Sequence, residues 1–359
     1  MSALAARAMG YDVHVLDPDP DCPARAVASQ VVTAPFDDVG AAVVFAQHCD
    51  VITLDIEQVS TESIAAASLH APVHPGAAPI HIIQDRGRQK EWLQDNGFPV
   101  APFRIAHTPT DVTHAFQALG RSIAKTSSGG YDGRGQARIR SLHDLDAAGA
   151  LTDTATVVVE QWIELAGELS VMVARSSAGE MCTFPVSWNH HDNGVLTWAM
   201  TPAPVSDDTT AAALALATAI TSRLDIVGLL AVEMFVTTDD TLMVNELAPR
   251  PHNTFHATER SCLTSQFEQQ VRAVCGLPLG STAVLSPGAI INLLGDLWRV
   301  DGQAPAWARA LEVPGVRLHL YGKKLAKSGR KMGHLSAVGA TADAARDAVL
   351  DAYSRLLPG

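Results

Sequence analysis

The sequence has few cysteines and none of the spacings that bind structural zinc. Its five cysteines are odd in number, widely scattered and never arranged as C-x-x-C: Cys22, Cys49, Cys182, Cys262 and Cys275. Scattered cysteines are typical of a reducing compartment, and structural zinc sites need paired ligands. The sequence therefore predicts a cytoplasmic protein and argues against structural zinc.

The sequence also lacks long apolar runs, a leader peptide and excess positive charge. No run reaches the roughly 18 apolar residues of a membrane helix, and the start MSALAARAMGYD has no basic segment followed by an apolar one. The formal net charge is −12, whereas nucleic-acid binding needs a basic face. With 359 residues, 47% hydrophobic and 18% charged, the chain is predicted to be an ordinary globular protein of two or three domains that binds neither nucleic acid nor membrane.

Alternating strand and helix patterns indicate an α/β fold whose first unit contains parallel strands. A stretch rich in proline, alanine and glycine at 70–79 is expected to separate this unit from the next. We expect helices at 2–10, 85–96, 211–224 and 341–357, and strands at 11–17, 51–54, 121–125, 156–163, 169–174, 181–186 and 290–294.

Two apolar runs, at 229–237 and from 242 onward, alternate as strands do and flank a Thr-Asp-Asp-Thr turn. A hairpin centred on the two aspartates would place Glu233 directly opposite Glu246, with Cβ atoms about 5 Å apart. Like charges in this position destabilise a sheet, so the pair calls for a cation, and oxygen ligands suit Mg²⁺ or Mn²⁺. In a slipped register, one glutamate would face inward and the other outward.

A glycine-rich segment follows Lys125, which lies at the end of a predicted strand. Glycines at 129, 130, 133 and 135 would let backbone N–H groups approach a polyphosphate closely. Because the lysine precedes the glycines, this is not a Walker A loop, and no helical pattern follows as in a dinucleotide-binding fold. The segment is either a nucleotide-binding loop between two strands or a merely flexible hairpin.

A cluster of cations near the C-terminus stands out from the acidic background. Lys323, Lys324, Lys327, Arg330 and Lys331 lie within nine residues that a Ser-Gly pair interrupts. Such a cluster is either a folded loop that binds a phosphate or a solvated charge run.

Several motifs together give the chain a resemblance to the ATP-grasp enzymes, and within them to the carboxyaminoimidazole ribonucleotide synthase family of purine biosynthesis. The motifs are QDR at 84–86, GGYDGRGQ at 129–136, GELSV at 167–171, NELAPRPHN at 245–253, SQFE at 265–268 and GRKMGH at 329–334. The resemblance covers nearly the whole chain. It implies an ATP-grasp fold with a truncated N-terminal α/β domain at 1–80, an ATP-grasp domain at 81–285 and a small C-terminal domain at 286–359.

The resemblance also implies roles for individual residues. ATP would be bound by Arg86, Lys125, Gly130, Tyr131, Asp132, Gly133, Arg134, Gly135, Gln136, Glu160, Gln161, Trp162, Ile163, Glu168, His191, Asn245 and Glu246. The metal ligands would be Glu233 and Glu246, and the aminoimidazole ribonucleotide would contact Tyr131, Asp132, Lys323 and Arg330. Arg250, Asp132 and Lys323 would be catalytic, with Arg250 stabilising carboxyphosphate.

The implied reaction uses ATP, bicarbonate and 5-aminoimidazole ribonucleotide, with Mg²⁺ as the cofactor, in a cytoplasmic homodimer. Two alternatives remain open. One is another acyl-phosphate ligase of the same superfamily, such as the formate-dependent glycinamide ribonucleotide transformylase. The other is a non-catalytic nucleotide-binding relative.

The chain departs from the family pattern at three places. The family opens with a strand and a Gly-Gly-Gly-Gln-Leu-Gly-Arg loop, whereas this chain begins at the helix that follows them. A parallel unit without its first strand would expose an unpaired edge, so we expect Met1 to be an internal methionine or a misassigned start. Phe255 stands where the family has glycine, and Trp188 stands where it has glutamate.

Overall fold

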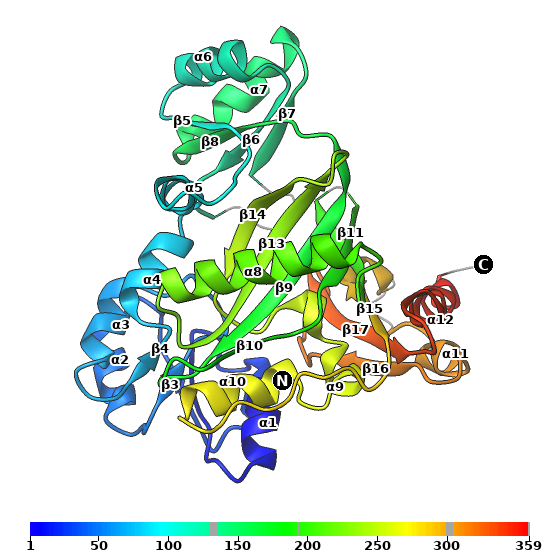
Figure 1. Cartoon of the computed structure of the whole chain (residues 1–359). Helices are drawn as coiled ribbons and strands as arrows, with labels where there is room; N and C mark the ends of the chain where they lie inside the picture. The colour runs from blue at the N-terminus through cyan, green and yellow to red at the C-terminus, as the bar shows by residue number, and fades with distance from the viewer. Residues whose placement is uncertain (130–134, 193, 299–303, 358–359) are drawn as a thin grey trace.

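The computed structural model describes residues 1–129, 135–192, 194–298 and 304–357, and its strands form four sheets (Figure 1). An N-terminal part lies at the lower left of Figure 1 and a small lobe at the top, and a large sheet runs through the centre towards the C-terminal helix at the right. Helices pack on these sheets, so the predicted α/β class is confirmed. Within the described ranges, no helix is both long and apolar enough to cross a membrane.

Parallel strand pairs and short helices build the N-terminal part. Its elements are α1 (Ser2–Ala8), β1 (His14–Asp17), η1 (Pro23–Ala26), β2 (Gln30–Thr33), α2 (Val39–Ala46), β3 (Ile52–Thr53), α3 (Thr61–Ala67), β4 (Val73–His74) and α4 (Ala77–Ile83). β1 lies parallel to β2, and β3 lies parallel to β4, in two separate sheets. Asp38 and Ser60 begin α2 and α3, because each side chain accepts a hydrogen bond from a backbone N–H of the first turn.

The stretch at 70–79 is not the boundary that its composition predicted. It contains β4 and the start of α4. Val73 pairs with Ile52 of β3, and Val73 and Ile80 are both buried in the core of the N-terminal part. Proline and glycine therefore shape turns inside this unit rather than a linker after it.

The small lobe is a four-stranded antiparallel sheet covered by helices (Figure 1). It follows α5 (Arg86–Asp95) and comprises β5 (Phe103–Ala106), α6 (Pro109–Leu119), β6 (Ser122–Thr126), β7 (Gln136–Ile139), η2 (Leu142–Asp144), α7 (Leu145–Gly149), η3 (Ala150–Asp153) and β8 (Val157–Gln161), in the sheet order β5-β8-β6-β7. Lys125 of β6 pairs with Gln136 of β7, so the glycine-rich segment joins two strands, as predicted. Its residues 130–134 lie outside the described ranges.

A nine-stranded sheet forms the centre of the molecule. Its first seven strands and their helices are β9 (Leu165–Arg175), β10 (Met181–Thr183), β11 (Ser187–Asp192), β12 (Val195–Thr201), α8 (Asp207–Arg223), β13 (Gly228–Thr237), β14 (Leu242–Ala248), η4 (Asn253–Phe255), α9 (Thr258–Ser261), α10 (Gln266–Val274) and β15 (Gly288–Leu294). β13 lies between β9 and β14, and all its residues are buried except Glu233 and Phe235, which are half-buried. α8 covers one face of these strands through the largest apolar core.

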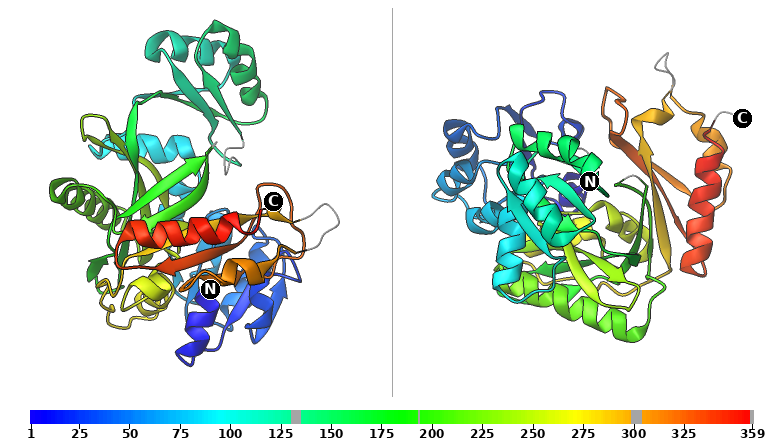
Figure 2. Two further views of the ribbon diagram at one scale, coloured as in Figure 1. Left: turned by 90° about the vertical axis from the view of Figure 1, so that its right-hand side faces the viewer. Right: turned by 90° about the horizontal axis from the view of Figure 1, so that it is seen from above.

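The C-terminal part continues this sheet. It adds η5 (Gly295–Leu297), α11 (Trp307–Leu311), β16 (Arg317–Leu320), β17 (Lys331–Val338) and α12 (Ala342–Ser354). β15 pairs with both β12 and β17, so the sheet runs without a break across residue 286, where the C-terminal domain is expected to begin. Figure 2 shows α12 lying along the C-terminal strands, and the basic cluster connects β16 to β17.

Candidate active site

Glu233 on β13 lies directly opposite Glu246 on β14. This is the pairing predicted from the sequence, and it excludes the slipped register. The Glu233 side chain is 16% exposed, whereas that of Glu246 is 47% exposed. One carboxylate is therefore largely withdrawn from water while the other opens towards solvent.

The turn that produces this pairing is longer than predicted. Asp240 has a φ of 62°, and the Thr237 N–H donates to the Thr241 carbonyl at 3.0 Å, so the loop holds three residues rather than two. Near the turn, Met234 therefore pairs with Val244. If this register continued along the strands, Glu233 would lie opposite Asn245 instead of Glu246. A register shift beside Glu233 takes up one extra residue, as a β-bulge does, and restores the glutamate pair.

The carboxylate pair is electrostatically strained without a cation. Burial and the charge of Glu246 raise the pKa of Glu233 to about 7. His252 Nε2 lies 3.2 Å from Glu233 Oε1, but burial and the charges of Arg250 and Lys331 lower the pKa of His252 well below its usual value. The imidazole is therefore neutral at pH 7 and does not offset the two negative charges. Two opposed carboxylates, one of them open to solvent, fit a Mg²⁺ ion that also binds substrate phosphates.

Arg86 connects the carboxylate pair to Thr126 and Ser127, which form the stem of the glycine-rich segment. Its Nη2 lies 3.5 Å from Glu246 Oε2, and its Nη1 donates to the Thr126 carbonyl at 2.8 Å. Its backbone N–H donates to the Ser127 carbonyl at 2.8 Å. The predicted ATP contact Arg86 is thus fixed between the two features that the sequence assigned to phosphate and metal binding.

The start of α5 holds the same stem from the other side. Asp85 begins this helix, and its carboxylate accepts hydrogen bonds from the Arg88 N–H at 2.8 Å and from Ser127 Oγ at 2.7 Å. The Gly87 N–H donates to Ser127 Oγ at 3.0 Å, and a Cβ at Gly87 would lie 3.1 Å from that oxygen. The QDR motif therefore has a structural role as well as a predicted binding role.

Lys125 belongs to a buried network of two lysines and one glutamate. Lys125 Nζ lies 3.0 Å from Glu160 Oε1, and Lys90 Nζ lies 3.2 Å from Glu160 Oε2. Burial alone would raise the pKa of Glu160, but the charges of Lys125 and Lys90 lower it to about 2. Both carboxylate oxygens contact ammonium groups, so Glu160 orients Lys125 towards the glycine-rich segment.

The segment after Glu160 is also engaged with its own lobe. The Gln161 N–H donates to the Pro102 carbonyl, and the Trp162 N–H donates to the Arg121 carbonyl, both at 2.8 Å. The Arg121 guanidinium lies 5.4 Å from the Trp162 ring centroid. Of the predicted adenine-binding segment 160–163, two N–H groups are therefore already used within the protein.

Glu168 and His191 meet on neighbouring strands of the large sheet. His191 Nδ1 lies 3.0 Å from Glu168 Oε2, and this partner raises the pKa of His191 although burial opposes the shift. Trp188, which replaces the usual glutamate, packs its ring over Gly167, where a Cβ would lie 2.0 Å from the ring. The tryptophan therefore supports the strand that carries Glu168.

Arg250 is held by a glutamate from the N-terminal part. Its Nε lies 2.5 Å and its Nη2 3.3 Å from the two carboxylate oxygens of Glu57. Burial would raise the pKa of Glu57, but the charge of Arg250 and its hydrogen bonds lower it. This bidentate pair fixes the guanidinium plane across the boundary between the two parts.

The basic cluster is a folded loop rather than a solvated run. Asp296 accepts hydrogen bonds from Ser328 Oγ at 2.5 Å and from the Gly329 N–H at 2.7 Å. Lys323 Nζ donates to the Lys331 carbonyl at 2.8 Å.

Of two other cations in this loop, Arg330 contacts the loop itself and Lys324 contacts the N-terminal part. Arg330 Nη1 donates to the Leu325 carbonyl at 3.0 Å, and Lys324 Nζ lies 2.6 Å from Asp21 Oδ2 in the N-terminal part. The loop therefore bridges back to the N-terminal part while Lys331 lies near Glu233.

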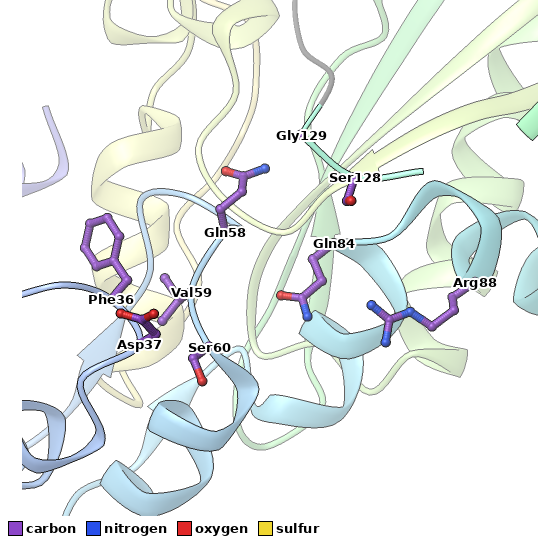
Figure 3. Close-up of a pocket in the computed structure, with 9 residues that line it drawn as sticks. All are labelled: Phe36, Asp37, Gln58, Val59, Ser60, Gln84, Arg88, Ser128 and Gly129. Atoms are coloured by element: carbon purple, nitrogen blue, oxygen red, sulfur yellow. The ribbon is translucent and has the colours of Figure 1, made fainter. Parts of the chain in front are cut away.

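An open cavity of about 490 Å³ adjoins these groups (Figure 3). It lies between the N-terminal part and the QDR motif, and it is lined by Phe36, Asp37, Gln58, Val59, Ser60, Gln84, Arg88, Ser128 and Gly129. In Figure 3, Gln58 and Gln84 lie on opposite sides of this space, and Ser128 and Gly129, where the glycine-rich segment begins, lie above Gln84. The cavity thus has room for a small ligand beside Gln84 of the QDR motif and the start of the glycine-rich segment at Ser128 and Gly129.

The structure brings the predicted residues Arg86, Glu233, Glu246 and His191 to one region. Arg86 contacts Glu246, and Lys331 lies near Glu233 and His191. Gly135 and Gln136 lead into β7, and Asn245 lies on β14 beside Glu246. Predicted residues Gly130, Tyr131, Asp132, Gly133 and Arg134 lie outside the described ranges.

Sequence reasoning missed four residues that complete this region: Glu57, Lys90, His252 and Lys331. Lys331 belongs to the basic cluster, and Lys90 lies four residues after the QDR motif. Their positions next to these motifs could therefore have indicated that both lysines lie near the site. Glu57 lies 193 positions before its partner, and only the folded chain shows that contact.

Phe255 does not enter the site. It is fully buried, and its ring centroid lies 6.2 Å from that of Phe184 in an apolar cluster on the sheet face that α8 does not cover. The replacement of glycine by phenylalanine therefore fills the core instead of narrowing the region around the carboxylate pair.

Three protein families match successive stretches of the chain. The ribonucleotide synthetase preATP-grasp domain matches residues 1–84, the ATP-grasp domain matches 91–267, and the phosphoribosylaminoimidazole carboxylase C-terminal domain matches 288–348.

Individual relatives agree over nearly the full length. An N5-carboxyaminoimidazole ribonucleotide synthase of Bacillus subtilis is 41% identical over 337 residues, which cover 94% of this chain and 87% of the relative. One of Brucella melitensis is 39% identical over 341 residues, covering 94% and 92%. A crystal structure of an N5-carboxyaminoimidazole ribonucleotide synthetase with ADP superposes with a TM-score of 0.93 at 38% identity, covering 98% of this chain and 92% of that chain. The Aspergillus clavatus synthase in complex with ADP and 5-aminoimidazole ribonucleotide superposes with a TM-score of 0.90 at 30% identity, covering 99% and 95%.

Proposed function

Since this chain belongs to the family of N5-carboxyaminoimidazole ribonucleotide synthases, we infer that it carboxylates 5-aminoimidazole ribonucleotide with bicarbonate in an ATP-dependent reaction. The products are the N5-carboxyamino ribonucleotide, ADP and phosphate. The enzyme is thus a ligase that forms a carbon–nitrogen bond in purine biosynthesis.

The observation that carries the proposal is the pairing of Glu233 with Glu246 next to Arg86. In this proposal the two glutamates hold Mg²⁺ or Mn²⁺, and a bound ion neutralises charge on the phosphoryl group during its transfer. Arg86 keeps the exposed carboxylate oriented and contributes a positive charge on the phosphate side. Positioning and electrostatics supply most of the rate in such transfers.

We propose that the nucleotide lies between the small lobe and the large sheet. Lys125, oriented by Glu160, faces the phosphates together with the glycine-rich segment through Gly135 and Gln136. The segment that ends at Ile163 borders the adenine. Because the Glu160 carboxylate is bound by two lysines, contact with the adenine amino group falls to other groups of this segment.

The remaining nucleotide contacts come from the large sheet. Glu168 accepts hydrogen bonds from the ribose, and its partner His191 holds the carboxylate in place. Asn245 stands beside the metal ligand Glu246 on β14, where its amide can contact a phosphate oxygen.

Bicarbonate is a poor electrophile, so the reaction proceeds by transfer of the γ-phosphoryl group to a bicarbonate oxygen. In our proposal Arg250 binds the resulting carboxyphosphate, and Glu57 fixes the guanidinium in a defined plane for that contact. The ribonucleotide amine then forms the new carbon–nitrogen bond as phosphate leaves. Asp132 would take the amine proton, and Tyr131 would contact the same ligand.

The basic loop is proposed to receive the ribonucleotide. Lys323 and Arg330 supply positive charge for its 5′-phosphate, and Asp296 holds the loop that carries them. Lys323 is also proposed to act on the reacting carboxyl group.

Measurement of ADP release tests this function. We expect release to require both bicarbonate and 5-aminoimidazole ribonucleotide, with the carboxyamino product formed in equal amount. Equal stimulation by glycinamide ribonucleotide with formate would favour the transformylase alternative. Nucleotide binding without release under any of these conditions would favour a non-catalytic relative.

We also propose that the enzyme acts in the cytoplasm as a homodimer. All five cysteines are free thiols in the structure, which agrees with a reducing compartment. Light scattering on the purified chain tests the dimer, and a monomer at micromolar concentration would contradict it.

A further inference from the structure

Two histidines and a glutamate gather between the large sheet's C-terminal strands and α9. His319 of β16 pairs directly with His334 of β17, and their rings stack with centroids 5.2 Å apart and planes 5° apart. Glu259 of α9 faces them, and one potential ligand atom from each of the three side chains lies within 4.8 Å of the others. His334 is 1% exposed whereas Glu259 is exposed, so the cluster opens to solvent on one side.

We propose that Glu259, His319 and His334 bind a divalent transition-metal ion of the Zn²⁺ class. Two imidazole nitrogens and one carboxylate oxygen are a ligand set that suits Zn²⁺ and leaves a fourth position open, whereas Mg²⁺ prefers oxygen ligands. This site is separate from the carboxylate pair Glu233 and Glu246, and no step of the carboxylation uses it.

Neighbouring groups leave the histidines suited to this role. Tyr321 Oη lies 3.0 Å from His334 Nδ1, so Nε2 remains for a metal, and such a second partner orients a ligating imidazole. The ring of His256 packs against that of His334, with the two centroids 4.8 Å apart. His256 is itself held by Gln266, whose Nε2 lies 2.9 Å from His256 Nδ1.

A metal at this site would join two parts of the molecule. Glu259 lies within the residues that match the ATP-grasp domain, and both histidines lie within those that match the C-terminal domain. The histidine strands also lead into and out of the basic loop. The N-terminal ammonium group and Arg317 are positive groups that act on Glu259, and both are expected to lower the affinity of the site for a cation.

Titration of the chelator-treated full chain with Zn²⁺ by calorimetry, and with Co²⁺ by visible absorption, tests the site in the presence of saturating Mg²⁺. We expect one equivalent to bind, with Co²⁺ bands typical of nitrogen ligands. His319→Ala and Glu259→Gln should lose this equivalent, and Tyr321→Phe should weaken it about 10- to 100-fold. The matched control His114→Ala, at an exposed histidine of α6, should bind as the unchanged protein does.

Two results would overturn the proposal. One is equal Zn²⁺ affinity in the unchanged protein and in both ligand variants. The other is loss of the same equivalent in His114→Ala, which would place the bound ion at the exposed histidine of α6 instead of at the proposed site. Glu259 is exposed, so Glu259→Gln should fold normally and keeps the test decisive if His319→Ala does not.

Discussion

The opposed glutamates show how one residue position can combine a structural disadvantage with a catalytic function. Placed across a hairpin, Glu233 and Glu246 repel each other, and burial increases the free energy of that repulsion. A β-bulge preserves the pairing although the turn alone would abolish it. The arrangement is understandable if a cation belongs between them.

Glu246→Gln should therefore separate stability from activity. We expect turnover to fall about 100-fold or more, by analogy with the loss of one electrostatic contact in other active sites. The midpoint of thermal unfolding without metal should not fall, because a like-charge contact is removed. Steady-state ADP release and calorimetry measure both, and the surface variant Glu164→Gln, 70% exposed, is the matched control. Unchanged turnover at saturating Mg²⁺ would contradict the metal assignment.

The raised pKa of Glu233 predicts a pH dependence with a defined sign. Its folded value, about 7, lies above the ordinary value of 4.5, so the folded protein holds a proton that the unfolded chain has released. This contribution to stability is complete below about pH 4.5 and is lost as the pH rises through 7. Without metal, the free energy of unfolding should fall from pH 5 to pH 8 by at least about 1 kcal/mol more than in Glu233→Gln. Urea unfolding of both proteins at the two pH values measures this difference. An equal change in the free energy of unfolding in the two proteins would refute the prediction.

At the scale of elements, the connection between β16 and β17 is the part most open to a functional test. Hydrogen bonds to Asp296 hold this loop in a fixed shape, which a solvated run of cations would lack. Its cations are not equivalent, because some contact the loop itself while Lys324 pairs with Asp21.

Arg330→Ala and Lys323→Ala should each weaken ribonucleotide binding about tenfold or more while leaving ATP binding nearly unchanged. The reason is the loss of a charge-assisted phosphate contact. Calorimetry with each ligand measures the two affinities. Lys324→Ala is the neighbouring control, since its exposed ion pair contributes little. Equal loss of both ligands would assign the loop to the nucleotide or to folding.

At the scale of the whole molecule, the site depends on contacts between parts that are distant in the chain. Glu57 of the N-terminal part binds Arg250, and Thr53 Oγ1 accepts a hydrogen bond from Gln270 Nε2 at 2.6 Å. The N-terminal part therefore helps to shape the site beyond the residues that it contributes to the cavity.

Glu57→Ala should lower turnover more than nucleotide affinity. Without its partner the Arg250 guanidinium is no longer fixed, and a buried charge loses its counterion, so the free energy of unfolding should also fall by about 3 kcal/mol. Kinetics, ADP titration and urea unfolding measure the three quantities. Glu57→Asp should recover part of the activity. Normal turnover in Glu57→Ala would show that Arg250 needs no positioning.

Local patterns were sufficient for the parts of the fold that depend on neighbouring residues. Period-2 alternation and the turn signal predicted the hairpin, and the glycine-rich segment was correctly predicted to join two strands. The Glu233–Glu246 pairing is confirmed, although the turn on which it was based has three residues and not two. Composition alone failed at 70–79, because burial of Val73 and Ile80 outweighs the local preference for a linker.

The sequence by itself determined the α/β class and the family, because periodicity and motifs are properties of short segments. The pairing of the glutamates was predicted correctly, but it also requires the β-bulge that only the structure shows. Only the tertiary structure decided that Glu160 is bound by two lysines, that Glu57 holds Arg250, and that the sheet continues from β12 into β15. It also brought Glu259 to the histidine pair. These contacts join residues tens to hundreds of positions apart, and their free energy arises only when burial removes water from both partners.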